Sequence, residues 1–221
     1  MWSYGQRLDT SDDNMKDTLK NKPTLEFELS LKKQGYKYII GVDEAGRGPL
    51  AGPVVAAAVY IPDGFNVEGI NDSKKLSSKK RELFYNKIVT ECEYSVAFVD
   101  ERVIDAINIR EATKLAMQRA INYFNDKADF AIVDGNFIPD MISIPARPII
   151  DGDAQSFSIA AASIVAKFTR DAHMEALDYI YPIYGFAKHK GYGTKDHLEA
   201  IRTYGPSYAH RKTFGGVKEY V

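Results

Sequence analysis

The stretch YKYIIGVDEAGRGP at residues 36–49 decides the fold expected of this chain and the chemistry it can carry. Aromatic and β-branched residues dominate positions 38–42, which is typical of a buried strand. That strand would deliver Asp43 and Glu44 to its carboxyl end. Arg47 follows between two glycines, where the backbone can approach a ligand closely and its N–H groups are unobstructed. Paired oxygen ligands beside an open backbone and a cation suit a metal-bound phosphodiester.

Two further acids stand at the ends of apolar runs. Asp134 closes the run 130–133 and precedes Gly135, while Asp153 follows the run 148–150. A single acidic pair before a glycine is most often a solvated turn. Three separate apolar runs that each end in an acid beside a glycine are harder to assign to chance. Ligands of α/β sheets bind beyond the carboxyl ends of the strands, so we expect these acids to converge.

Six motifs along the chain carry a resemblance to a known family. They are GVDEAGRGP (41–49), NDSKKLS (71–77), VDGN (133–136), GD (152–153), AAASIVAKFTRD (160–171) and HKGYGT (189–194). In this order they resemble the ribonuclease HII family, the type 2 ribonucleases H of the retroviral-integrase-like superfamily. The resemblance extends from about Tyr38 to Phe214 and leaves the first thirty-odd residues outside it.

The expected fold is α/β, a ribonuclease H-like mixed five-stranded sheet flanked by helices, with a C-terminal helical region and a short N-terminal extension. The hydrophobic pattern predicts three strands joined by short links, followed by strands separated by helices, which favours a mixed sheet with a meander at one side. Strands are expected at 36–43, 53–61, 94–99, 130–134 and 146–150. Helices are expected at 23–34, 78–90, 111–124 and 156–181.

A chain of 221 residues suits one domain with an appendage. We expect an N-terminal extension at 1–35, a loose arm plus a short helix, and a catalytic domain at 36–221. Cys92 is the only cysteine, which excludes a disulfide framework and a cysteine-based zinc site. The N-terminus lacks the apolar core of a signal peptide, and no stretch approaches the roughly 18 apolar residues of a membrane span. A cytoplasmic protein without a membrane partner is the expectation, and the resemblance favours a monomer.

Charge is nearly balanced overall, with 29 basic and 30 acidic residues, but basic residues cluster locally. Local basic surface beside an acidic centre suits a metal-dependent nuclease, although a solvated basic face is the simpler explanation for either cluster alone. The four histidines have spacings unlike a zinc site, so phosphate contacts or surface positions are expected for them. The residues concerned are Lys188, Lys190, Lys195, Arg202, Arg211 and Lys212 in one cluster, Lys74, Lys75, Lys79, Lys80 and Arg81 in the other, and His173, His189, His197 and His210.

The resemblance implies roles for particular residues. Two Mg²⁺ or Mn²⁺ ions would be held by four carboxylates: Asp43, Glu44, Asp134 and Asp153. Substrate contacts are implied for Gly46, Arg47, Gly48 and Tyr192, and we add Lys74 as a contact to a backbone phosphate. The glycine-flanked backbone would bind the ribose 2′-hydroxyl, which distinguishes RNA from DNA. The tyrosine ring would pack on the next sugar, where deoxyribose fits better.

Three details of this assignment stay open from sequence. Adjacent strand residues point to opposite faces, so the strand must end or bulge for Asp43 and Glu44 to reach one site, unless Glu44 contributes its backbone carbonyl. Asp151 rivals Asp153, because both would lie on one face of an extended segment. Asp171 is expected to pair with Lys167 one helical turn away.

We therefore expect an endonuclease that hydrolyses the RNA strand of RNA–DNA hybrids and incises 5′ of a ribonucleotide embedded in duplex DNA. Its products would carry 5′-phosphate and 3′-hydroxyl ends. One alternative is the sister ribonuclease HIII type, although the extension of about 35 residues is short for its N-terminal domain. Another is a non-catalytic hybrid-binding protein, which would have no use for four carboxylates near phosphates. A small-molecule phosphatase would leave Tyr192 and the basic clusters without a reason.

Overall fold

The computed structural model describes residues 22–70, 73–74 and 76–221. At its centre is one five-stranded sheet in the order β3-β2-β1-β4-β5. Strand β2 runs antiparallel to both of its neighbours, β1 and β3, whereas β4 and β5 run parallel to β1, which confirms the expected mixed sheet with a meander at one side. The strands are β1 (Ile39–Ala45), β2 (Val54–Tyr60), β3 (Glu93–Val99), β4 (Phe130–Asp134) and β5 (Ala146–Ile149).

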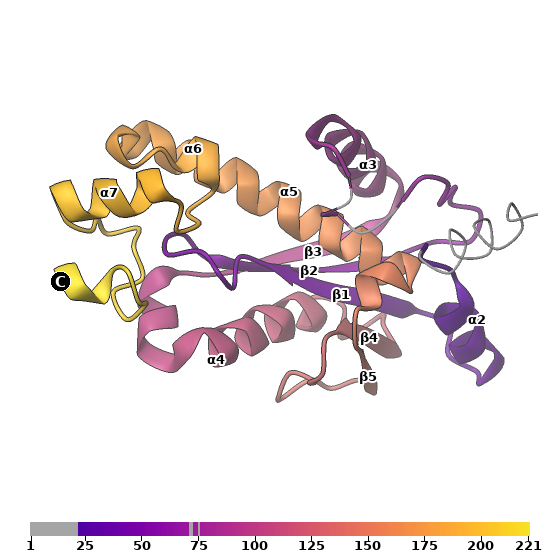
Figure 1. Cartoon of the computed structure of the whole chain (residues 1–221). Helices are drawn as coiled ribbons and strands as arrows, with labels where there is room; N and C mark the ends of the chain where they lie inside the picture. The colour runs from indigo at the N-terminus through magenta and orange to yellow at the C-terminus, as the bar shows by residue number, and fades with distance from the viewer. Residues whose placement is uncertain (1–21, 71–72, 75) are drawn as a thin grey trace, which may run out of the picture.

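Helices cover both faces of the sheet (Figure 1). Helix α4 (Glu101–Asn122) packs on one face, and α3 (Ser78–Glu91) and α5 (Phe157–Ile180) lie on the other. The start of α5 lies directly against β1, because a Cβ on Gly41 would come within 2.1 Å of the Ser158 backbone. Three consecutive alanines at 160–162 permit the same close approach further along α5. The expected α/β fold is therefore present.

Two boundaries differ from the sequence expectation. Strand β1 runs to Ala45 instead of ending at residue 43. The helix expected at 78–90 is confirmed as α3, and it makes the connection from β2 to β3 longer than the short link expected within the meander. Helix α4 begins at residue 101, ten residues before the expected start. It bends at Asn108, which has a φ of 68°, and Asp100 caps its first segment while the Asn108 side chain accepts hydrogen bonds from the second. Two caps in one stretch explain why only the second helical segment was predicted.

The N-terminal extension contributes α2 (Glu26–Lys33), close to the helix expected at 23–34. Leu31 of α2 is buried, and Thr24 pairs with Ser156 at the start of α5. This part of the extension therefore packs on the body of the protein, whereas most of the expected loose arm lies outside the described residues. The boundary at 35/36 stays a prediction.

The C-terminal region is helical, as expected, and caps the far end of α5 (Figure 1). Its core is a separate buried cluster that includes Leu50, Met174, Phe186 and Ile201. None of the helices in the described part of the chain has the length and apolar character to cross a membrane. The remaining elements are η1 (Gly152–Ala154), η2 (Pro182–Tyr184), α6 (Phe186–His189), α7 (Lys195–Tyr204) and η3 (Lys218–Tyr220).

Candidate active site

Three carboxylates meet at the carboxyl ends of two neighbouring strands. One carboxyl oxygen from each of Asp43, Glu44 and Asp134 lies within 4.8 Å of the others. The parallel register of β1 and β4 places Val42 beside Val133, so the acids that follow them leave the sheet side by side. The predicted convergence is confirmed for these three residues.

Asp43 and Glu44 reach the same place although they are neighbours in a regular strand. The strand neither ends nor bulges at this point, since Glu44 and the next residue still pair with β2. Of the two alternatives that the sequence left open, a break at this point is therefore wrong, and the contribution of the Glu44 backbone carbonyl stays a prediction. Instead, the Asp43 carboxylate accepts a 2.7 Å hydrogen bond from the Glu44 backbone N–H, which turns it along the chain toward its neighbour.

Asp153 lies at the edge of this trio. It sits in the short helix η1, is only 5% exposed, and its charge helps to raise the pKa of Asp43. The backbone N–H of Gly152, one residue earlier, donates a 2.7 Å hydrogen bond to Asp134. The Lys74 ammonium is 3.3 Å from the Asp153 carboxylate. The structure thus brings Asp153 and Lys74 next to the cluster but outside the group of three.

The other two acids in question have different surroundings. Asp151 is exposed and has a φ of 52°, so the segment is a turn and lacks the extended conformation in which Asp151 and Asp153 would share a face. Its charge still contributes to raising the pKa of Asp134. Asp171 is 2.6 Å from Lys167 and 3.7 Å from Arg81. Its predicted ion pair is confirmed.

The pKa values of all three carboxylates are raised, which means that their ionised forms are disfavoured in the metal-free cluster. Burial, followed by the charges of Glu44 and Asp134, raises the pKa of Asp43 well above its usual range. Burial also raises the pKa of Glu44, against the opposing charge of Arg47, and burial raises the pKa of Asp134. Crowded hard oxygen donors of this kind fit Mg²⁺ or Mn²⁺, whose positive charge would favour their ionised forms.

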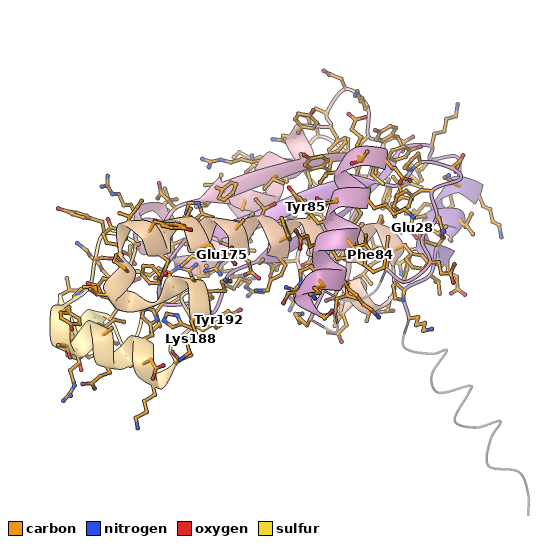
Figure 2. The ribbon with its side chains drawn as sticks, turned by 90° about the horizontal axis from the view of Figure 1, so that it is seen from above. Glu28, Phe84, Tyr85, Glu175, Lys188 and Tyr192 are labelled. Atoms are coloured by element: carbon orange, nitrogen blue, oxygen red, sulfur yellow. The ribbon has the colours of Figure 1, made fainter. Side chains whose placement is uncertain are left out.

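The predicted substrate-contacting residues lie beside the cluster. Gly46 has a φ of 96°, and a Cβ on Gly48 would lie 3.6 Å from the ring of Tyr192. The Tyr192 side chain projects from the C-terminal end of the molecule in Figure 2. The half-exposed Arg47 guanidinium is 3.3 Å from Glu44. A pocket of about 170 Å³ opens here, lined by Glu44, Ala45, Gly46, Ser73, Lys74, Ser163, Lys167, Arg170 and Tyr192.

Two buried arginines hold the glycine-rich loop, and the sequence reasoning missed this role. Arg170 donates hydrogen bonds to the carbonyls of Ala51 and Pro53, at 3.0 and 2.9 Å. Arg211 is fully buried, so its expected place in a basic surface is wrong. A loop with many carbonyls and no strand partner does require donors, but the sequence does not say which ones. The acceptors of Arg211 are the carbonyls of Gly46, Arg47, Pro49 and Gly52, at 2.6 to 3.0 Å.

The remaining basic residues are less available than expected. Three of the C-terminal cluster form ion pairs: Lys188 with Asp196, Lys190 with Glu175, and Arg202 with Glu199. In the other cluster, Arg81 donates to the carbonyls of Ser73 and Leu76, whereas Lys79 and Lys80 are exposed at the start of α3. Lys75 lies outside the described residues. Expected phosphate contacts are thus confined to fewer side chains than the count suggested.

The histidines are also not where they were expected. His189, His197 and His210 are buried together in the C-terminal region, and His173 is half-buried against Phe98. The expected surface positions are therefore wrong for His189, His197 and His210, and only His173 is partly exposed. Spacing along the sequence could not reveal a cluster whose members come from three different turns and helices.

Comparisons with known proteins agree with this arrangement. A family model described as Ribonuclease HII matches residues 40–216. A ribonuclease HII of Caldicellulosiruptor saccharolyticus is 53% identical over 190 residues, which are 86% of this chain and 92% of that protein.

Solved structures agree with the fold. The crystal structure of ribonuclease H2 from Pyrococcus horikoshii OT3 has a TM-score of 0.69 and 27% identity, over 83% of this chain and 97% of that one. A crystal structure of Bst-RNase HIII in complex with Mn²⁺ has a TM-score of 0.68 at 19% identity, over 87% of this chain and 71% of that one, and shows a likeness of fold alone.

The family model and the close relative decide against the sister type and against a protein that only binds hybrids. Both span Asp43, Glu44 and Asp134, called the acidic trio below, and the glycine turn at residues 46–48. The chain belongs to the ribonuclease HII family and is a ribonuclease H enzyme.

Proposed function

We propose that this enzyme hydrolyses the RNA strand of RNA–DNA hybrids and also incises 5′ of single ribonucleotides in duplex DNA, leaving 5′-phosphate and 3′-hydroxyl ends. The observation that carries the proposal is the meeting of three carboxylates from β1 and β4 beside a glycine turn and an exposed tyrosine. Carboxylates alone repel a phosphodiester, so the arrangement makes sense for a metal-dependent nuclease.

Asp43, Glu44 and Asp134, with Asp153 at their edge, would hold two Mg²⁺ or Mn²⁺ ions. The chemistry such ions supply is activation of a water and neutralisation of the departing 3′-oxygen. The chain's own contribution is to fix the ligands: the Glu44 N–H holds Asp43, and the Gly152 N–H holds Asp134. No side-chain nucleophile is required.

The glycine turn would recognise the ribonucleotide. Arg211 occupies the carbonyls of Gly46 and Arg47, so the backbone of the turn is fixed before substrate binds. A fixed backbone can form hydrogen bonds to a 2′-hydroxyl without first losing conformational freedom. Tyr192 lies beside Gly48 and would pack on the neighbouring sugar. This pairing supports incision at an RNA-to-DNA junction.

Lys74 would contact a backbone phosphate. Its side chain is 78% exposed, and its ammonium lies 3.3 Å from Asp153. A phosphate bound at the carboxylates would therefore find this cation within reach. Ser77 caps α3 a few residues later by accepting from the Lys80 N–H, which fixes the end of this segment.

The test is cleavage of two substrates by the purified protein with Mg²⁺ or Mn²⁺: an RNA–DNA hybrid, and a DNA duplex with one embedded ribonucleotide. We expect incision of both, with the second cut 5′ of the ribonucleotide. Asp43→Asn should lower the rate at least about 100-fold, the scale for removing an electrostatic partner of the transition state. Asp151→Asn, at the exposed neighbouring acid, is the matched control. No incision by the wild type, or full activity of Asp43→Asn, would overturn the proposal.

A further inference from the structure

A chain of buried histidines lies behind Tyr192. The Nε2 atoms of His197 and His210 are 3.0 Å apart, and the rings of His189 and His197 stack at 4.3 Å between centroids. The Nδ1 of His197 is 2.9 Å from the carbonyl oxygen of Tyr192. This network touches the backbone of the residue that we assign to the sugar, and nothing in the mechanism above uses it.

Backbone contacts fix which nitrogen of each ring carries a proton. The Ser207 backbone N–H points to Nδ1 of His210 at 3.0 Å, so Nδ1 is an acceptor and Nε2 of that ring must carry the hydrogen. His210 therefore donates from Nε2 to Nε2 of His197. His197, accepting there, carries its hydrogen on Nδ1 and donates to the Tyr192 carbonyl.

The third ring follows the same logic. The Gly191 N–H points to Nδ1 of His189 at 3.2 Å, and Nε2 of His189 donates to the Tyr184 carbonyl at 2.7 Å. Each ring thus has a single defined tautomer, with the hydrogen on Nε2 in His189 and His210 and on Nδ1 in His197. A second proton on His197 would set two donors face to face. In agreement, burial lowers the pKa of His197 to about 4 and that of His210 to about 3.

The segment around Tyr192 depends on such outside contacts. Lys190 and Gly191 have φ values of 54° and 85°, so two consecutive residues before the tyrosine have positive φ. Lys190 is not a glycine, so its left-handed conformation is strained. The Tyr192 carbonyl accepts from His197 and from the Thr194 N–H, which ties the strained turn to the start of α7.

A metal site is a weaker explanation of the same cluster. The two closest nitrogens, Nε2 of His197 and Nε2 of His210, already share a hydrogen, and their Nδ1 atoms are engaged by Tyr192 and Ser207. Within the described residues, the acidic trio is the group whose ligand atoms converge closely enough for an ion.

We propose that His197 is a positioning residue for Tyr192 and that His210 fixes the tautomer in which His197 does this. The inference rests on the proposed contact of Tyr192 with the sugar beside the ribonucleotide. The histidine pair binds the backbone carbonyl of Tyr192 and so holds the Tyr192 ring next to Gly48. It therefore sets how well the enzyme selects an RNA-to-DNA junction, without touching substrate.

The test uses variants that keep or remove one donor. The amide nitrogen of an asparagine matches Nδ1 of histidine, so His197→Asn retains the hydrogen bond to Tyr192 and His197→Leu removes it. The amide nitrogen of a glutamine matches Nε2, so His210→Gln retains the donor to His197 and His210→Leu removes it. His173→Asn, at a half-buried histidine away from this network, is the control.

Two readouts are measured on each variant. The first is the ratio of kcat/KM on a single-ribonucleotide duplex to kcat/KM on an all-RNA hybrid, which we expect to fall about 10- to 100-fold in the leucine variants. The second is hydrogen exchange of the peptide spanning 190–196 in the free protein, which we expect to accelerate in the same variants. The asparagine and glutamine variants should stay within about threefold of wild type in both, by the same scale. In a Tyr192→Ala background, His197→Leu should no longer change the ratio.

Equal losses in His197→Asn and His197→Leu would show that the ring acts only by filling the core, and would overturn the proposal. Unchanged exchange at 190–196 in His197→Leu would do the same. If the wild type fails to incise the single-ribonucleotide duplex, the proposed function fails on its own, while the exchange experiment still decides whether His197 positions Tyr192.

Discussion

Arg211, ten residues from the end of the chain, donates a 2.6 Å hydrogen bond to the carbonyl of Gly46 in the glycine turn beside the acidic trio. Four further hydrogen bonds run from the same guanidinium to the carbonyls of Arg47, Pro49 and Gly52. A planar group with several fixed donors is suited to such a loop, because it satisfies carbonyls that have no strand partner. The C-terminal region is therefore part of the site's architecture.

Replacing Arg211 by lysine should destabilise the protein by about 3 kcal/mol, since one ammonium cannot reach all the carbonyls and several are left buried without a donor. Urea unfolding monitored by circular dichroism measures the loss. Arg202→Lys is the matched control, because Arg202 is exposed and paired with Glu199, and it should change stability by less than about 0.5 kcal/mol. Equal stability of both variants would contradict a supporting role for Arg211.

The acidic trio should make the metal-free protein less stable than it could be. Burial and mutual repulsion raise the pKa of Asp43, so its ionised form is disfavoured in the folded state at neutral pH. Asp43→Asn removes that charge, retains an oxygen to accept from the Glu44 N–H, and should raise the melting temperature in the presence of a chelator. Thermal unfolding followed by circular dichroism measures this directly.

Added Mn²⁺ should stabilise the wild type more than Asp43→Asn, which is the reverse of their order in chelator. At an ion concentration about 100-fold above its dissociation constant, the wild type should gain about 2.7 kcal/mol, and Asp43→Asn much less. A wild type whose melting temperature ignores divalent ions, or a variant that gains as much, would argue against metal binding at this cluster. Asp151→Asn should behave as wild type in both conditions.

The N-terminal helix should stabilise the segment that carries Asp153. One carboxyl oxygen of Glu28 accepts hydrogen bonds from the hydroxyls of Ser156 and Ser158, both at 2.6 Å, and from the Ser158 N–H at 3.1 Å. Figure 2 places Glu28 at the α2 end of the molecule. Glu28→Ala should cost about 2 kcal/mol, because it leaves buried donors at the start of α5 unpaired.

Urea unfolding measures this cost, and Glu26→Ala is the matched control on the exposed side of the same helix. The control should lie within about 0.5 kcal/mol of wild type. If Glu28→Ala were equally harmless, α2 would be an accessory without a role in holding the start of α5.

What could be predicted from sequence follows from how local each signal is. The acids of β1 and β4 could be predicted to converge, because apolar runs mark strands and parallel strands end at one edge. The ion pair of Asp171 with Lys167 could be predicted because both lie on one turn of one helix. Both conclusions needed only a local pattern and a general rule of sheet or helix geometry.

The rest could not be predicted because its partners are far apart along the chain. Arg211 counted as a surface cation until the loop that it binds was known, and the loop lies about 160 residues away. The histidine cluster likewise joins His189, His197 and His210 through carbonyls and N–H groups that no sequence pattern announces. Polar residues buried by long-range partners have no periodic signature, and a count of charges or of histidines places them on the surface by default.

Stability should fall in mild acid because of the neutral histidine pair. Burial lowers the pKa of His197 from 6.5 to about 4 and that of His210 from 6.5 to about 3. Well above pH 6.5 both rings are neutral whether the chain is folded or not, and they add no pH dependence. Between pH 6.5 and about 4 the unfolded chain binds protons at these two rings that the folded protein does not bind, so the free energy of unfolding falls by up to about 1.4 kcal/mol per pH unit for each ring.

The acidic trio works in the opposite direction, since its raised pKa values favour the folded state as pH falls. The measurement is therefore a difference: urea unfolding at pH 7.5, 6.5, 5.5 and 4.5 for wild type and His210→Gln. The variant should lose less stability on acidification, by about 1 kcal/mol per pH unit in the middle of this range. If the free energy of unfolding changed with pH in the same way for both proteins, His210 would be protonated as easily in the folded protein as in the unfolded chain. The assignment of an unprotonated Nδ1 on His210, and with it the hydrogen-bond directions from Ser207 to Tyr192, would then be wrong.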